Sequence, residues 1–80
     1  MLPRVKTVKT IQDYQLLIGF DNGEVRIFDV KPYLQIGIFK QLKSPGVFNS
    51  AKVIDGSIQW QNDADFCPDT LYLESNLIVT

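Results

Sequence analysis

The strongest structural signal in this 80-residue chain is the stretch YQLLIGFDNGEVRIFD, residues 14–29. In its first half, apolar residues occupy every second position and therefore share one face of a strand. These residues are Tyr14, Leu16, Ile18 and Phe20. The opposite face of the same strand carries Gln15, Leu17 and Gly19. Asn22-Gly23 then tolerates the positive φ angles of a two-residue hairpin turn. The stretch predicts an antiparallel hairpin of Tyr14–Phe20 with Glu24–Asp29, in which Val25 and Ile27 alternate with other side chains.

The segments on either side of this hairpin carry weaker signals. Val5–Thr10 is rich in Val and Thr but alternates imperfectly, which predicts an edge strand or a bulge. Lys31-Pro32 suits the first turn of a short helix, because Pro there needs no N–H. The apolar spacing in Gly37–Lys43 indicates one or two helical turns, which Ser44-Pro45-Gly46 closes. Val47-Phe48 is expected to return to the core.

The last third of the chain predicts a second hairpin and a second short helix. Ser50–Ile54 and Ser57–Gln61 flank Asp55-Gly56, another type I′ turn signal. A polar loop over residues 61–65 follows, and Pro68 begins a helix with an apolar stripe at residues 71–73.

These elements give an α+β domain in two layers, with the order β-β-β-α-β-β-α. We expect one five-stranded sheet that is mixed or rich in antiparallel pairs. The chain forms a single domain, residues 1–80, in which 1–74 are globular and Ser75–Thr80 is a tail. The apolar residues of this tail are expected to add a strand, dock on a partner or fray.

Composition narrows the function classes. One cored domain accounts for 80 residues, and no apolar run approaches the roughly 18–20 residues of a membrane helix. The sequence has no His and a single cysteine, Cys67, which removes the commonest general base and metal ligand and any internal disulfide. No apolar signal segment follows Met1, so the expected compartment is a reducing cytoplasm. We expect no enzyme activity and no cofactor.

Asp63, Asp65 and Asp69 form the one group that resembles a site, because carboxylate oxygens can hold divalent cations. The spacing fails the calcium-binding EF-hand pattern, since Pro68 stands at the sixth position, where that loop needs Gly. We therefore interpret the acids as a solvated loop and helix cap, and Cys67 as a half-buried structural thiol.

Charge is divided along the chain. All eight Lys and Arg lie at or before Lys52, and five acids with no base follow it. This division suits an acidic face for a basic partner, or a basic face for an anionic one. The acidic face is expected to consist of Asp63, Asp65, Asp69, Trp60 and Tyr72. The candidate phosphate-binding residues are Arg4, Lys6, Lys9 and Arg26.

Three parts of the chain resemble the domain-of-unknown-function 2442 family. They are the run Asp13–Val30 with its Phe-Asp-Asn-Gly-Glu hairpin, the spaced residues Gly37, Phe39, Leu42, Phe48 and Val53, and the close Ile58–Tyr72 with Trp60, Asn62 and Phe66-x-Pro68-Asp69. The resemblance covers about residues 3–73. It implies a small bacterial, archaeal or phage-borne cytoplasmic protein with a compact α+β fold and no assigned activity. It also implies a neighbouring short protein of the domain-of-unknown-function 4160 type, the pair being read as a toxin–antitoxin system.

Two hypotheses follow from the sequence. The first is a non-enzymatic protein-interaction module, as the antitoxin half of such a pair, whose partner is a small protein encoded nearby or a second copy of the chain. The alternative is a nucleic-acid-binding or autoregulatory module that uses the basic N-terminal strand.

Overall fold

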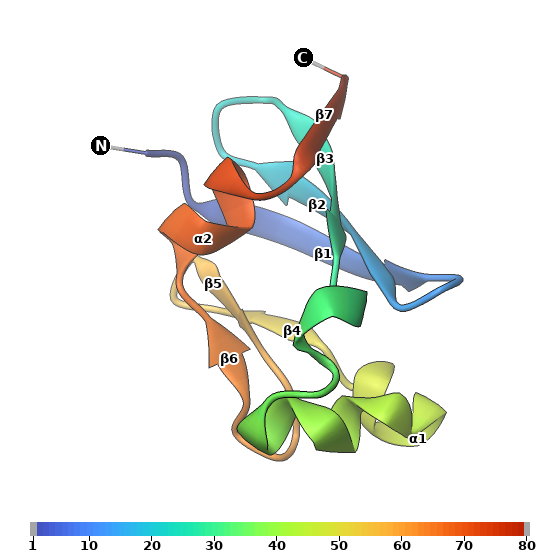
Figure 1. Cartoon of the computed structure of the whole chain (residues 1–80). Coiled ribbons are helices and arrows are strands. Elements are labelled where there is room, and N and C mark those ends of the chain that lie inside the picture. Colours follow the sequence, from blue (N-terminus) through green and yellow to red (C-terminus); the bar gives the residue numbers. More distant parts are fainter. Residues whose placement is uncertain (1, 80) are drawn as a thin grey trace.

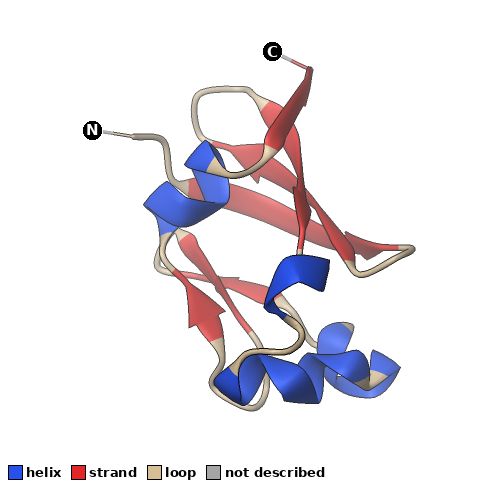
Figure 2. Cartoon of the chain, viewed as in Figure 1, coloured by secondary structure: helices blue, strands red, loops and turns tan. Residues whose placement is uncertain are grey.

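The computed structural model describes residues 2–79 and places them in two antiparallel sheets and several short helices (Figures 1 and 2). The four-stranded sheet has the order β1-β2-β3-β7, with β1 at Val5–Ile11, β2 at Gln15–Phe20, β3 at Val25–Asp29 and β7 at Asn76–Val79. The three-stranded sheet has the order β4-β5-β6, with β4 at Lys52–Ile54, β5 at Ser57–Gln59 and β6 at Asp65–Phe66. The α+β class is confirmed, but the single five-stranded sheet is wrong.

The helical segments lie between the strands. They are η1 at Lys31–Tyr33, η2 at Gly37–Lys43, α1 at Pro45–Phe48 and α2 at Pro68–Leu73. The helical predictions at Lys31-Pro32, at Gly37–Lys43 and at Pro68 are confirmed, the first two as 3-10 helices. Ser44-Pro45-Gly46 does not close the helical region, because Pro45 occupies the first turn of α1.

Both predicted hairpins form. Their turns differ in type. In the second hairpin, Asp55 and Gly56 both have positive φ (52° and 77°), as a type I′ turn requires. In the first hairpin Gly23 has positive φ (87°), whereas Asn22 does not. The amide of Phe20 donates to the carbonyl of Glu24 at 2.9 Å, which closes a three-residue loop in place of the expected two-residue turn.

Two strands were not predicted as such. β6 has only two residues and falls partly in the expected polar loop, where Asp65 pairs with Gln59. β7 lies in the expected tail and pairs antiparallel with β3, Leu77 opposite Arg26. Of the three outcomes expected for the tail, the added strand is therefore the one observed. Thr80 lies outside the described residues.

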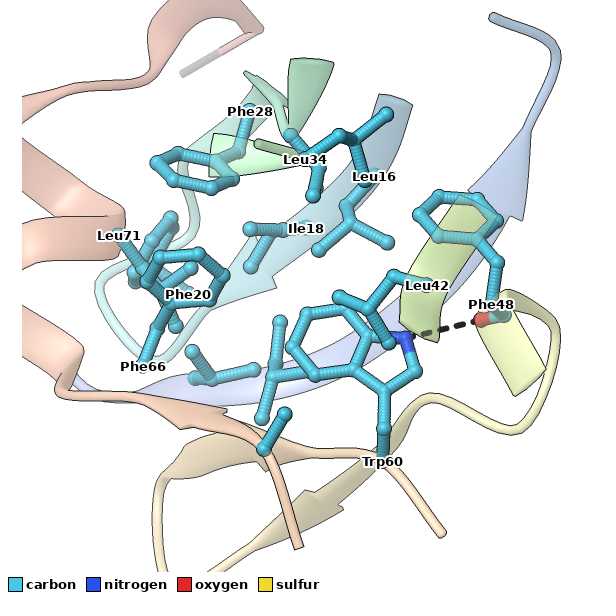
Figure 3. Packing of buried hydrophobic residues seen from close by; sticks show 14 residues of the cluster. Leu16, Ile18, Phe20, Phe28, Leu34, Leu42, Phe48, Trp60, Phe66 and Leu71 are labelled. Carbon is cyan, nitrogen blue, oxygen red and sulfur yellow. Dashed lines mark hydrogen bonds between the residues drawn. The ribbon is translucent and has the colours of Figure 1, made fainter. Parts of the chain in front are cut away.

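One hydrophobic core fills the space between the two sheets and the helices (Figure 3). β2 supplies Leu16, Ile18 and Phe20, which are 0–2% exposed, as the alternation predicts. Trp60 is 1% exposed, and its indole N–H donates to the carbonyl of Phe48 at 2.9 Å (Figure 3). This bond satisfies the one polar atom of a large buried side chain, which would otherwise be costly to desolvate.

Arg26 fastens the C-terminal segment to the four-stranded sheet. Its guanidinium lies 4.1 Å from the ring centre of Tyr72 on α2 and donates to the carbonyl of Ser75 at 3.2 Å. Its Nε donates to Glu24 at 2.8 Å, and Glu24 also accepts from the hydroxyl of Tyr72 at 3.1 Å. Cation–π, ion-pair and hydrogen-bond contacts together hold α2 and β7 against β3.

Candidate functional site

The outer face of the four-stranded sheet carries three aliphatic side chains, Leu17, Val25 and Ile27. Strand register places Leu17 opposite Ile27, and Gly19 opposite Val25, on the side away from the buried residues of β2. Antiparallel sheets with one solvated face usually carry polar residues there. All four residues are only partly buried, and α2 and the second sheet lie on the other side (Figure 1). We call this surface the outer sheet face.

A hollow of about 280 Å³ opens on the outer sheet face. It is lined by Thr7, Val8, Lys9, Leu17, Gly19 and Val25. Gly19 contributes backbone to the floor of the hollow, because it has no side chain in a row where its neighbours do. A Cβ added at Gly19 would clash with Oγ1 of Thr7, which lies above it.

Register irregularities flank this row of the sheet. β1 shifts register between Val5 and Thr7, and the β3–β7 pairing shifts at Val25 and Arg26. Bulges of this kind increase the local twist of a sheet and are common next to binding sites. They place the hollow where the sheet departs most from a regular ladder.

The rim of the hollow has a defined polarity. Lys9 is the one charged residue among the six that line it, and its side chain is exposed. Within residues 2–79, no acidic side chain forms an ion pair with Lys9. The exposed Thr7 adds a hydroxyl, while Leu17 and Val25 supply apolar walls. A ligand that carries an apolar group next to an anionic group would match this arrangement.

The expected acidic face is only partly assembled. Asp63, Asp65 and Asp69 are all exposed, on the β5–β6 loop, β6 and α2 respectively. In the part of the chain that the structure describes, no group of three His, Cys, Asp or Glu is placed to hold a metal ion. Trp60 lies in the core and does not contribute to a surface, and Tyr72 is half-buried under Arg26.

Cys67 is exposed, so its interpretation as a half-buried thiol is wrong. Its sulfur caps α2 by accepting from the amide of Thr70 at 3.5 Å, and it lies 3.1 Å from the Thr70 hydroxyl. These contacts to Thr70, led by the one with its side chain, lower the pKa of the Cys67 thiol. The exposure of Cys67 could not be predicted from the sequence, because an unpaired Cys is usually buried.

The expected phosphate-binding residues do not form one surface. Arg4 donates to the carbonyl of Asp55, and Arg26 is engaged with Glu24 and Tyr72. Lys6 and Lys9 are both exposed on β1. Two of the four cations are therefore occupied by contacts within the fold.

Exposed apolar side chains also gather on the C-terminal segment. Leu73 of α2 is 68% exposed, and Leu77 and Ile78 of β7 are 49% and 50% exposed. Leu77 pairs with Arg26, which in turn pairs with the buried Ile18, so Leu77 lies on the side of the sheet opposite to the outer sheet face. A second exposed pair, Ile36 and Ile38, lies in and just before η2. None of the helices in residues 2–79 has the length and apolar character needed to cross a membrane.

Fold and surface together define a small α+β domain built from two antiparallel sheets, one of which leaves an apolar face open. The model of the family described as "Protein of unknown function (DUF2442)" matches residues 5–76. The chain belongs to this family, as its hairpin and its Trp60-to-Tyr72 close predict. Neither the comparison with curated proteins nor that with solved structures gives a match.

The outer sheet face was not predicted as a site, although a signal was present. β2 has apolar residues at consecutive positions, Leu16 and Leu17, and β3 has Ile27 next to Phe28. A strand with apolar residues on both faces is typical of a sheet covered on both sides. Only one side is covered in residues 2–79.

Proposed function

We propose that this chain is a non-enzymatic protein-interaction module that binds its partner through the outer sheet face. The observation that carries the proposal is the apolar row Leu17, Val25 and Ile27 on the uncovered side of the central strands. Burial of apolar surface is the main driving force of protein association. A partner that covers this face would complete the two-sided burial that the sequence of β2 and β3 favours.

The dimensions favour a protein over a cofactor. Ligand pockets usually enclose about 300–1,000 Å³, whereas this hollow has about 280 Å³ and is open to solvent. Ile27, which pairs with Leu17 on the same face and does not line the hollow, extends the apolar surface beyond it. A broad surface with one shallow hollow is typical of a protein interface with a single anchor.

We further propose that the partner is a small protein encoded nearby, with this chain in the antitoxin role. The family resemblance motivates this assignment. The experiment is co-purification of the tagged chain from its native cells, followed by mass spectrometry of stoichiometric partners. Val25→Lys should remove the partner, because it places a charge in the apolar row.

Ile38→Lys is the matched control, since it makes the same kind of change at an exposed apolar residue of η2. Circular dichroism establishes that both variants fold. Retention of the partner by folded Val25→Lys, at the level seen with Ile38→Lys, would exclude the outer sheet face.

The exposed acids form a separate part of the proposal. If the partner is basic, Asp63, Asp65 and Asp69 should accelerate association without providing much affinity. Changing all three to Lys should slow the on-rate, and more so at low salt, in stopped-flow mixing with the purified partner. An on-rate that does not change, at any salt concentration, excludes this acidic face.

Nucleic-acid binding is the second candidate, and the exposure of Lys6 and Lys9 on β1 is the observation that favours it. Phosphate contacts release counterions, so binding should weaken steeply as salt rises. Gel shifts of short DNA and RNA at low salt, with Lys6→Glu and Lys9→Glu as variants, test it. Absence of any shift for the wild type ends this candidate.

A further inference from the structure

We infer that the hollow at Gly19 binds the carboxyl-terminal residue of a partner chain, with its apolar side chain against Leu17 and Val25 and its carboxylate at Lys9. The inference rests on the proposed function and names the chemical group that the outer sheet face would recognise. It is carried by the juxtaposition of an apolar floor with one uncompensated cation in a space the size of one residue.

The floor selects the side chain. Leu17 and Val25 line the hollow beside Gly19, and both are aliphatic. An aliphatic side chain placed there removes apolar surface of both partners from water. A polar side chain placed against Leu17 and Val25 would lose water contacts without gaining a hydrogen-bond partner from either.

The rim selects the charge. Lys9 lines the hollow, is exposed, and pairs with no acidic side chain in residues 2–79. A carboxylate at this position gains a charge-assisted hydrogen bond from the ammonium group. A second cation would be repelled by Lys9.

The spacing selects a chain end. Strand register pairs Lys9 with Leu17 and Thr7 with Gly19, so Lys9 and Gly19 are diagonal neighbours on one face of the sheet. Diagonal neighbours in an antiparallel pair lie about 7–8 Å apart. A carboxyl-terminal Leu or Val suits this spacing, because it carries an apolar group and a carboxylate on one Cα.

The hydroxyl of Thr7 completes the site. Thr7 is exposed, and its Oγ1 lies over Gly19 at the edge of the hollow. From there it can donate to the second carboxylate oxygen, while the backbone of the bound residue remains on the solvent side. All of these groups come from β1, β2 and β3, which are held in register by the sheet ladder.

The probes are two acetylated tripeptides, Ac-Ser-Gly-Leu with a free carboxylate and the same peptide with a terminal amide. Each is titrated into the 15N-labelled chain, and the amide signals of Thr7, Gly19 and Val25 are followed by NMR. The carboxylate peptide should shift these signals and bind about three- to fivefold more tightly than the amide, as expected for an exposed ion pair.

Three variants separate the contributions. Lys9→Gln should remove the preference for the carboxylate, and Gly19→Ala should weaken both peptides because its Cβ displaces the Thr7 hydroxyl, which borders the hollow. Lys6→Gln is the matched control, because Lys6 is exposed on the same strand but does not line the hollow, and it should leave the preference unchanged. Equal binding of the two peptides to the wild type, or shifts confined to other residues, would overturn the inference.

A third probe distinguishes the source of the carboxylate. 4-Methylpentanoate presents the same branched side chain and carboxylate without a peptide. If it binds more tightly than the peptide, the site takes a free apolar acid and the assignment to a chain end is wrong. If the co-purified partner is lost from Val25→Lys while the two tripeptides bind the wild type equally, the proposed function stands and this inference fails.

Discussion

Replacement of Gly19 by Ala tests how the hollow is built. The new Cβ would meet Oγ1 of Thr7, whereas the Cβ of Thr7 would lie at an ordinary 3.7 Å. The φ angle of Gly19 is not positive, so the backbone accepts Ala without strain. The conflict involves a hydroxyl on an exposed side chain, which can rotate about χ1.

The magnitude follows from two opposing contributions. A side chain moved away from its preferred rotamer costs about 0.5–1.5 kcal/mol. Ala in place of Gly within a strand recovers about 0.5–1 kcal/mol through the lower entropy of the unfolded chain. We expect the free energy of unfolding of Gly19→Ala to remain within about 1 kcal/mol of the wild-type value.

A double-mutant cycle isolates the contact between the two side chains. In a Thr7→Ala background the obstructing hydroxyl is absent, so Gly19→Ala should stabilise the fold by about 0.5–1 kcal/mol. Urea denaturation monitored by the fluorescence of Trp60 gives all four free energies. A loss of more than about 3 kcal/mol on Gly19→Ala in both backgrounds would show that Gly19 is needed for another reason and refute the geometry of the hollow.

The remaining predictions concern a turn and two titrating groups. Gly23→Val should lower the free energy of unfolding by about 1–2 kcal/mol, because the φ angle there is 87°. The cost comes from the backbone alone, since no atom lies within 4 Å of an added Cβ. A wild-type midpoint in thermal or urea denaturation would contradict the turn assignment. The hydrogen bond to Glu74, and to a smaller extent burial, raise the pKa of Tyr33 to about 12. Phenolate formation is thus disfavoured in the folded state, and the resulting stability is complete below pH 10 and lost as the pH rises towards about 12. Ultraviolet titration should show this raised pKa of Tyr33, and Glu74→Gln should lower the pKa towards its ordinary value. An unchanged pKa in Glu74→Gln would contradict the assignment to Glu74. Alkylation of Cys67 by iodoacetamide should reach half its maximal rate at a higher pH in Thr70→Val, and an unchanged profile would exclude Thr70 as the cause.

The elements with strong local signals could be predicted from the sequence. Asn22-Gly23 and Asp55-Gly56 specify turns through backbone conformation, and the alternation of β2 specifies a buried face, so both hairpins form where expected. Pro68 marks the start of α2 for the same local reason. The loop at Asn22-Gly23 is one residue longer than expected, because Asp21 joins it and Asn22 does not adopt the positive φ that a two-residue turn requires.

The strands with distant partners could not be predicted in the same way. β7 has four residues, and its partner β3 lies about fifty positions earlier in the chain. Its stability depends on contacts such as those of Arg26 with Tyr72 and Ser75, which no local pattern reveals. With only two residues, β6 has too short an alternation to detect.

The candidate site, like the fold, could be predicted from the sequence only in part. The exposure of Asp63, Asp65 and Asp69 agrees with their polarity, but the sequence could not show that Trp60 points into the core. Nor could it show that Lys9 and Gly19 share one hollow, since this depends on the pairing register of β1 with β2. A one-residue slip would place them on opposite faces.

The most direct test of the outer sheet face is solvent paramagnetic relaxation of methyl groups by a soluble gadolinium complex. In the purified chain alone, methyl signals of Leu17, Val25 and Ile27 should relax faster than those of Leu16 and Ile18, which are 0% exposed. When the co-purified partner is added, the first three should become protected. Full relaxation of these three methyls in the complex, with protection elsewhere on the chain, would contradict the central claim that this face binds the partner.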